Sequence, residues 1–147
     1  MDLFRYAATA KNLLIGAGAY YLAGWLRFFL WFGWHRLTDH VIYSGSFESA
    51  VVMPVVLELP KAVVAFGAGA AVVWLCESAR PLGWVIFPVL LYAVFGFFGY
   101  HWAHPPVFAD RVEQTVAALF PAAACAFGGM MAARWRARAT RVNTNRN

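Results

Sequence analysis

Residues 12–35, NLLIGAGAYYLAGWLRFFLWFGWH, form an apolar run that contains one charged side chain, Arg27. A helix needs about 20 predominantly apolar residues to cross the hydrocarbon core of a bilayer, and this run is long enough. Three further runs meet the same criterion, at residues 53–76, 83–102 and 112–133. The sequence therefore predicts an all-α integral membrane protein that folds as a four-helix up-down bundle.

The composition leads to the same class of protein. Of the 147 residues, 62% are hydrophobic and 13% are charged, whereas about a quarter of the residues of a soluble domain are charged. We expect one transmembrane domain over residues 1–135 and a basic polar tail over residues 136–147. The end of that tail, residues 140–147, is polar and is expected to have no fixed structure.

The basic residues predict the orientation of the bundle, because they are enriched on the cytoplasmic side of a membrane. The first and third connections carry Arg36 and Arg111 together with acidic residues. The C-terminal segment carries five arginines and no acidic residue: Arg134, Arg136, Arg138, Arg141 and Arg146. Both termini should then be cytoplasmic in a multi-pass membrane protein. Topology and anionic lipid headgroups account for this charge, so no nucleic-acid partner is expected.

Three charged residues lie within the predicted spans: Arg27 in the first, and Glu58 and Lys61 in the second. Because a charge within a membrane is costly, we predict that Arg27 and Glu58 form an ion pair between the first two helices. Lys61 lies one turn from Glu58, where an i,i+3 contact is possible. The three residues either tie the helices together or form a polar pocket for an anionic headgroup, a quinone or a proton.

The four histidines gather at two places in the sequence. The motif FGWH ends at His35, and the similar motif FGYH ends at His101. A further histidine follows each motif, His40 after the first and His104 after the second. If the first and third helices lie diagonally across the bundle, His35 and His101 face one another. They are then candidate ligands of haem iron, or of a smaller metal together with the other two. The alternative is that they belong to an aromatic belt at the membrane interface.

Small residues in the predicted spans indicate close contacts between helices, because lipid gives no hydrophobic drive for helices to associate. These residues include Gly16, Gly18, Gly67, Gly69, Gly96, Gly128 and Gly129. Cys76 and Cys125 form no C-x-x-C motif and are expected to be buried small apolar residues. Since no nucleophile–base pair or metal signature stands out, we expect no independent catalytic activity.

The segment Gly33-Trp34-His35-Arg36-Leu37 looks like the G-x-x-K-L ending of the first helix in DoxX-like proteins, with Arg36 in place of the usual lysine. Glu58 in the second helix and Arg80 in a short inner turn also fit that pattern. The chain thus resembles a family of small four-helix bacterial membrane proteins. The resemblance implies association with redox enzymes, among them a quinone-reducing thiosulfate oxidoreductase. The segment 58–61, ELPK, departs from the smooth apolar second helix of that family.

These observations favour an accessory or anchor subunit of a membrane redox assembly, with quinone as a candidate ligand near Arg27, Glu58 and His35. Its expected partners are the lipid bilayer and other membrane protein subunits. One alternative is a stand-alone carrier or channel for a small solute, lipid or ion. Another is a haem-bearing electron-transfer subunit that uses the outer-face histidines.

Overall fold

The computed structural model consists of four helices over the residues that it describes, 3–38, 47–76, 78, 80–101 and 108–144. Side chains are described for residues 6–30, 33–34, 55–76, 78, 80–98 and 114–140. The helices are α1 (Leu3–Thr38), α2 (Phe47–Leu75), α3 (Leu82–His101) and α4 (Phe108–Thr144). The all-α fold with four helices that the apolar runs predict is confirmed.

Two helices extend well beyond the apolar runs that predicted them. α1 begins at Leu3, and α4 continues to Thr144 without a break at residue 136. The added segments, residues 3–11 and 134–144, are rich in alanine, lysine and arginine, which have high helix propensity. Hydropathy detects only the apolar part of a helix, so the lengths predicted for α1 and α4 are too short. The expected lack of structure from residue 140 onward is wrong as far as residue 144, and residues 145–147 lie outside the described residues.

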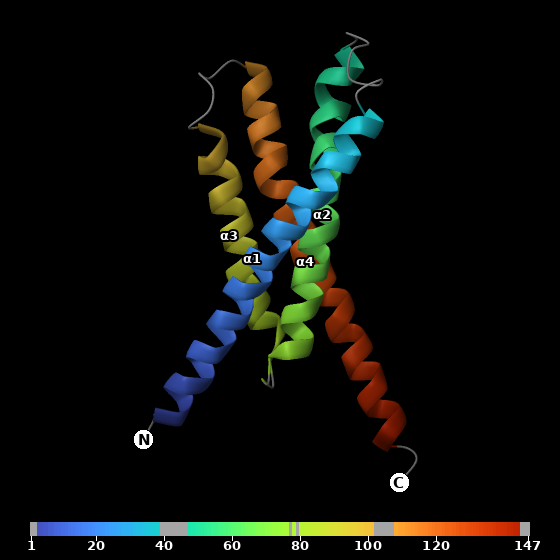
Figure 1. The fold of residues 1–147 in the computed structure, drawn as a ribbon. Helices are drawn as coiled ribbons and strands as arrows, with labels where there is room; N and C mark the ends of the chain where they lie inside the picture. The colour runs from blue at the N-terminus through green and yellow to red at the C-terminus, as the bar shows by residue number, and fades with distance from the viewer. Residues whose placement is uncertain (1–2, 39–46, 77, 79, 102–107, 145–147) are drawn as a thin grey trace.

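Successive helices run in opposite directions, so both chain ends lie at the same end of the bundle (Figure 1). The C-terminal ends of α1 and α3 lie at the opposite end. α1 packs against α2 and α3, and α4 packs against the same two helices, whereas the described residues of α1 and α4 make no contact. α1 and α3 are therefore neighbours, and the diagonal arrangement expected for them is wrong.

The close approach of α2 to α4 explains this order. A Cβ atom on Gly69 would collide with the backbone carbonyl of Cys125, and one on Gly128 would collide with the carbonyl of Phe66. Only glycine, which has no Cβ, lets two helix backbones come this close. α2 and α4 accordingly share the most extensive interface of the bundle, and α1 packs beside them against α2 and α3.

The other predicted small-residue contacts divide into two groups. A Cβ atom at Gly16, Gly96 or Gly129 would meet a neighbouring helix at 3.0, 2.7 or 2.8 Å, so these glycines do lie at helix contacts. Gly18 and Gly67 have no such neighbour within 4 Å. The pattern of small residues therefore identified positions at helix contacts. It did not distinguish glycines that contact a neighbouring helix from glycines that face open space.

Three helices contain segments long and apolar enough to cross a membrane: Tyr6–Leu30 in α1, Val55–Leu75 in α2 and Gln114–Thr140 in α4. α3 contributes a shorter apolar segment, Leu82–Phe98, among the residues whose side chains are described. These lengths agree with a helical bundle of the membrane class.

The core of the bundle is built from small side chains. Ala65, Val72, Val73 and Cys125 have no exposed surface, and Cys76 is 1% exposed. Both cysteines are free thiols, so their prediction as small buried residues is confirmed. Large apolar side chains face outward instead, among them Tyr6, Leu14, Leu22, Trp25, Phe29, Ile86, Leu119 and Trp135. Soluble proteins rarely expose so much apolar surface, whereas a lipid-facing surface needs it.

Candidate functional site

Lys61 reaches from α2 to α4, and a proline explains its hydrogen-bond partner. Pro121 lies inside α4 and has no N–H group, so the carbonyl of Ala117, four residues earlier, lacks its usual donor within the helix. Lys61 Nζ donates a hydrogen bond to that carbonyl oxygen, at 2.9 Å. The lysine thus replaces the donor that the proline removes.

Trp34 satisfies a second carbonyl of the same kind. Pro60 lies inside α2 and deprives the carbonyl of Val56 of its donor. Trp34 Nε1 of α1 donates to the Val56 oxygen at 2.8 Å. The backbone polar groups freed by two prolines are therefore both paired by side chains of neighbouring helices.

Carbonyls in the last turns of helices are paired in a similar way. Gln114 Nε2 of α4 donates to the oxygen of Phe97, one turn before the end of α3, at 2.9 Å. Arg136 Nη1 of α4 donates to the oxygens of Val73 and Cys76 at the end of α2, at 2.8 and 3.3 Å. The last carbonyls of a helix have no donor within it, and a cation near them is favoured by the helix dipole. Arg136 is therefore part of the packed bundle.

Glu58 forms its ion pair with Lys61. Lys61 Nζ lies 3.1 Å from Glu58 Oε2, and the two side chains are only 11% and 17% exposed. The carboxylate oxygen has no aligned hydrogen bond, so the contact is mainly Coulombic. The ion pair predicted between Glu58 and Arg27 is not among the ion pairs of the described residues. Lys61 takes that place because it lies one turn further along the same helix, while Arg27 lines a pocket between α1, α2 and α3.

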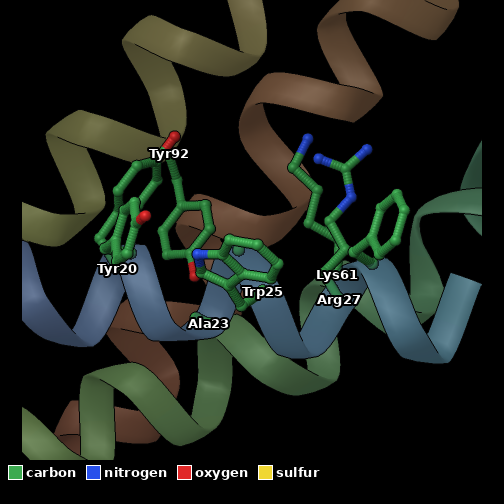
Figure 2. Close-up of a pocket in the computed structure, with 9 residues that line it drawn as sticks. Tyr20, Ala23, Trp25, Arg27, Lys61 and Tyr92 are labelled. Atoms are coloured by element: carbon green, nitrogen blue, oxygen red, sulfur yellow. The ribbon is translucent and has the colours of Figure 1, made fainter.

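That pocket has a volume of about 410 Å³ and lies where α1 meets Lys61 of α2 and Tyr92 of α3 (Figure 2). α1 supplies the rest of the lining: Tyr20, Tyr21, Ala23, Gly24, Trp25, Arg27 and Phe28. The pocket therefore combines the intramembrane lysine and arginine predicted as a polar site with aromatic side chains from two helices.

One end of the pocket is aromatic. The rings of Tyr20 and Tyr92 meet edge to face with their centroids 4.8 Å apart, and Phe95 stacks on Tyr20 at 5.9 Å. Tyr92 is only 4% exposed, and its hydroxyl has no hydrogen-bond partner among the described residues. A buried hydroxyl without a partner carries a desolvation penalty, so a hydrogen-bond partner for this group would be favourable.

The other end of the pocket is positively charged. Figure 2 shows the side chains of Lys61 and Arg27 beside one another, with Trp25 between them and the tyrosines. Lys61 lies eight residues inside the apolar run that begins at residue 53, which is about 12 Å along the helix. Arg27 forms no ion pair with any described residue.

The four histidines proposed as haem or metal ligands have side chains that lie outside the described part of the structure. The backbones of His35 and His101 lie in the last turns of α1 and α3, but their side chains are not described. His40 and His104 fall outside the described residues altogether. Among the residues searched, no group of three or more metal-ligating side chains comes together. The haem and metal roles therefore stay predictions.

Of the residues that line the pocket, the sequence analysis predicted only Arg27 and Lys61 as site residues, and it missed the aromatic members, among them Tyr20 and Tyr92. Nothing in the sequence marks them, because their contact depends on α1 and α3 being neighbours. The partner of Lys61 did have a signal, since Pro121 inside an apolar run predicts an unpaired carbonyl at Ala117.

A comparison with protein-family models finds no match, and comparisons with curated proteins and with solved structures find none either. The resemblance to DoxX-like proteins stays a prediction. The function proposed below is therefore inferred from the helices, the pocket and the outer surface of this chain.

Proposed function

We propose that this chain is an integral membrane accessory subunit, which anchors or holds other subunits of a redox assembly in the bacterial inner membrane. Integration into the membrane is supported by the paired carbonyls of Val56 and Ala117. The hydrocarbon core contains no water that could satisfy a carbonyl freed by a proline, so the protein must supply a donor. Trp34 and Lys61 do so.

The arrangement of the chain ends supports the proposed orientation. Both ends lie at one end of the bundle (Figure 1), and the C-terminal part of α4 carries Arg134, Arg136, Arg138 and Arg141 there. Arginine near a transmembrane helix favours the cytoplasmic side. Both termini are then cytoplasmic, and the pocket with Arg27 and Lys61 lies toward the outer face.

An open groove between α1 and α2 is the observation that supports a subunit role. The groove has a volume of about 540 Å³ and is lined only by apolar and small residues, including Gly18, Leu22, Ala23, Gly67 and Ala68. A Cβ atom on Gly18 or Gly67 would meet nothing within 4 Å. Small residues at a membrane helix surface let another helix approach closely. The groove therefore fits a transmembrane helix of a partner subunit.

The outer surface of α1 favours the same role. Tyr21, Leu22, Trp25 and Phe29 are each more than half exposed. Tryptophan and tyrosine are enriched at the centres of protein interfaces. The redox character of the assembly depends on the DoxX-like segment at residues 33–37.

Photo-crosslinking tests this function in membranes of the organism that makes the protein. A benzoylphenylalanine replaces Leu22, which lines the groove and is 69% exposed, and in a control it replaces Ile86 of α3, which is 59% exposed. We expect Leu22 to give a crosslink to one defined polypeptide and Ile86 to give lipid adducts only.

A second comparison tests whether the groove itself is the contact. Gly67→Leu fills the groove, whereas Gly83→Leu adds the same side chain at another open position, on α3. Gly67→Leu should remove the crosslink from Leu22 and Gly83→Leu should retain it. Only lipid adducts at Leu22, or an isolated chain that transports a solute by itself, would contradict the subunit role and favour a carrier.

A further inference from the structure

The pocket between α1, α2 and α3 is unbalanced in charge. It brings together Arg27 and Lys61, and the carboxylate of Glu58 is the counter-ion of Lys61. Lys61 is therefore neutralised, while Arg27 has no counter-ion among the described residues. Arg27 lies inside the apolar run 12–35, about 12 Å along the helix from His35, where an uncompensated charge is unfavourable. An anion bound beside both cations would remove this imbalance.

A second, independent observation also indicates a ligand. Tyr92 lines the same pocket, and its buried hydroxyl lacks a hydrogen-bond partner among the described residues. Buried polar groups in proteins almost always have a partner. A ligand that reaches this hydroxyl from the pocket would supply the missing partner.

The walls of the pocket indicate that the ligand is amphiphilic. Trp25 and Phe28 line the pocket and are 55% and 54% exposed, so the pocket opens sideways to the surroundings of the bundle. Tyr20 and Arg27 lie about 10 Å apart along α1, and Arg27 is nearer the end of the apolar segment. A ligand that enters from the bilayer thus places its charged group toward the C-terminal end of α1 and its apolar part deeper in the bundle.

We propose that this pocket binds an anionic phospholipid, whose phosphate lies between Arg27 and Lys61 and whose apolar part lies along Trp25 and Tyr20. The Tyr92 hydroxyl donates to an ester oxygen below the phosphate. Arginine binds phosphate with strong charge-assisted hydrogen bonds. This site shares Ala23 with the groove for a partner helix but is otherwise lined by different residues, and it does not depend on the subunit role.

Native mass spectrometry of the full-length protein tests the proposal. Delipidated protein in detergent is titrated with phosphatidylglycerol or phosphatidylcholine of identical acyl chains. We expect phosphatidylglycerol to bind at least about tenfold more tightly, as expected for a charge-assisted contact. Arg27→Gln should remove that preference, and Tyr92→Phe should weaken binding about three- to tenfold through loss of one hydrogen bond. Arg138→Gln, an exposed arginine of α4, is the matched control and should leave binding unchanged.

Two outcomes would overturn the proposal. The first is equal binding of the two lipids, with no effect of Arg27→Gln in a protein that elutes as the folded wild type. The second is displacement of the lipid by millimolar glycerol phosphate or inorganic phosphate, which would assign the site to a soluble phosphate compound. Neither outcome affects the crosslink from Leu22, so failure of the lipid site and failure of the subunit role are distinguishable.

Discussion

Replacing Lys61 with methionine removes a hydrogen bond and an ion pair in one step. Methionine is similar in length and apolar, so it should fill the space of the lysine side chain. The carbonyl of Ala117 then loses the donor that replaces the missing N–H of Pro121. Glu58, whose side chain is 17% exposed, loses its cation.

The size of the effect can be worked out from these two losses. An uncompensated carboxylate costs about 2.5–3.5 kcal/mol at the centre of a membrane helix, and less toward its end. A hydrogen bond between helices in a membrane contributes about 0.6 kcal/mol on average and up to about 1.7 kcal/mol. Lys61→Met should therefore lower the free energy of unfolding by about 2–4 kcal/mol. The double variant Glu58→Gln/Lys61→Met should lose only about 1 kcal/mol, because no charge is left unpaired.

A double-mutant cycle with Pro121→Ala isolates the hydrogen bond. Alanine restores an N–H group that donates to the Ala117 carbonyl within α4, so Lys61 is no longer needed for that oxygen. The cavity left by the buried proline ring is present in both proline-free variants and cancels in the cycle. Lys61→Met should cost about 0.6–1.7 kcal/mol less when Pro121 is replaced.

Reversible unfolding in mixed detergent–SDS micelles, followed by far-UV circular dichroism, measures the four free energies of the cycle. Val63→Met, at an exposed position of α2 with no polar contact to lose, controls for the methionine side chain. Additivity within about 0.5 kcal/mol would refute the reasoning, because independent sites add to that extent.

Three further predictions concern packing, capping and reactivity. Gly69→Leu should abolish the folded elution peak in size-exclusion chromatography, because even a Cβ atom at this position collides with the α4 backbone. Gly67→Leu should elute as the wild type does. Equal behaviour of the two variants would contradict the packing of α2 against α4. Arg136→Gln should lower the stability by about 1 kcal/mol through loss of bonds to the end of α2, while Arg138→Gln leaves the thermal midpoint unchanged. Burial raises the pKa of the Cys76 thiol, and the nearby Arg136 opposes this shift only in part, so the thiol stays protonated at pH 7.5. Maleimide should therefore label Cys76 only after SDS is added. Labelling of the native protein at the same rate would disprove the burial of Cys76.

The number and direction of the helices could be predicted from the sequence, because length and hydropathy determine them directly. The order of the helices around the bundle could not. It depends on which glycines face one another, and Gly69 and Gly128 bring α2 against α4. Gly67 lies in the same apolar run as Gly69 but faces open space. The sequence around Gly67 and Gly69 does not distinguish the two positions.

The candidate site was predicted in part. Arg27, Glu58 and Lys61 are visible in the sequence because charge is rare in apolar runs. The contact between Glu58 and Lys61 that their spacing allows is present, whereas no ion pair joins Arg27 to Glu58 among the described residues, because matching depth along two helices does not determine which side chain is nearer. Tyr92 joins the site only through contact between α1 and α3, which no local pattern encodes.

Cysteine accessibility in intact cells tests most directly whether the bundle crosses the membrane with both ends in the cytoplasm. Cysteine replaces Thr140 near the end of α4 or Ser44 between α1 and α2, and the buried native cysteines provide an unreactive background that the wild type checks. An impermeant maleimide should label Ser44→Cys in intact cells and Thr140→Cys only after the membrane is permeabilised. Labelling of Thr140→Cys in intact cells, or protection of both positions, would contradict the account.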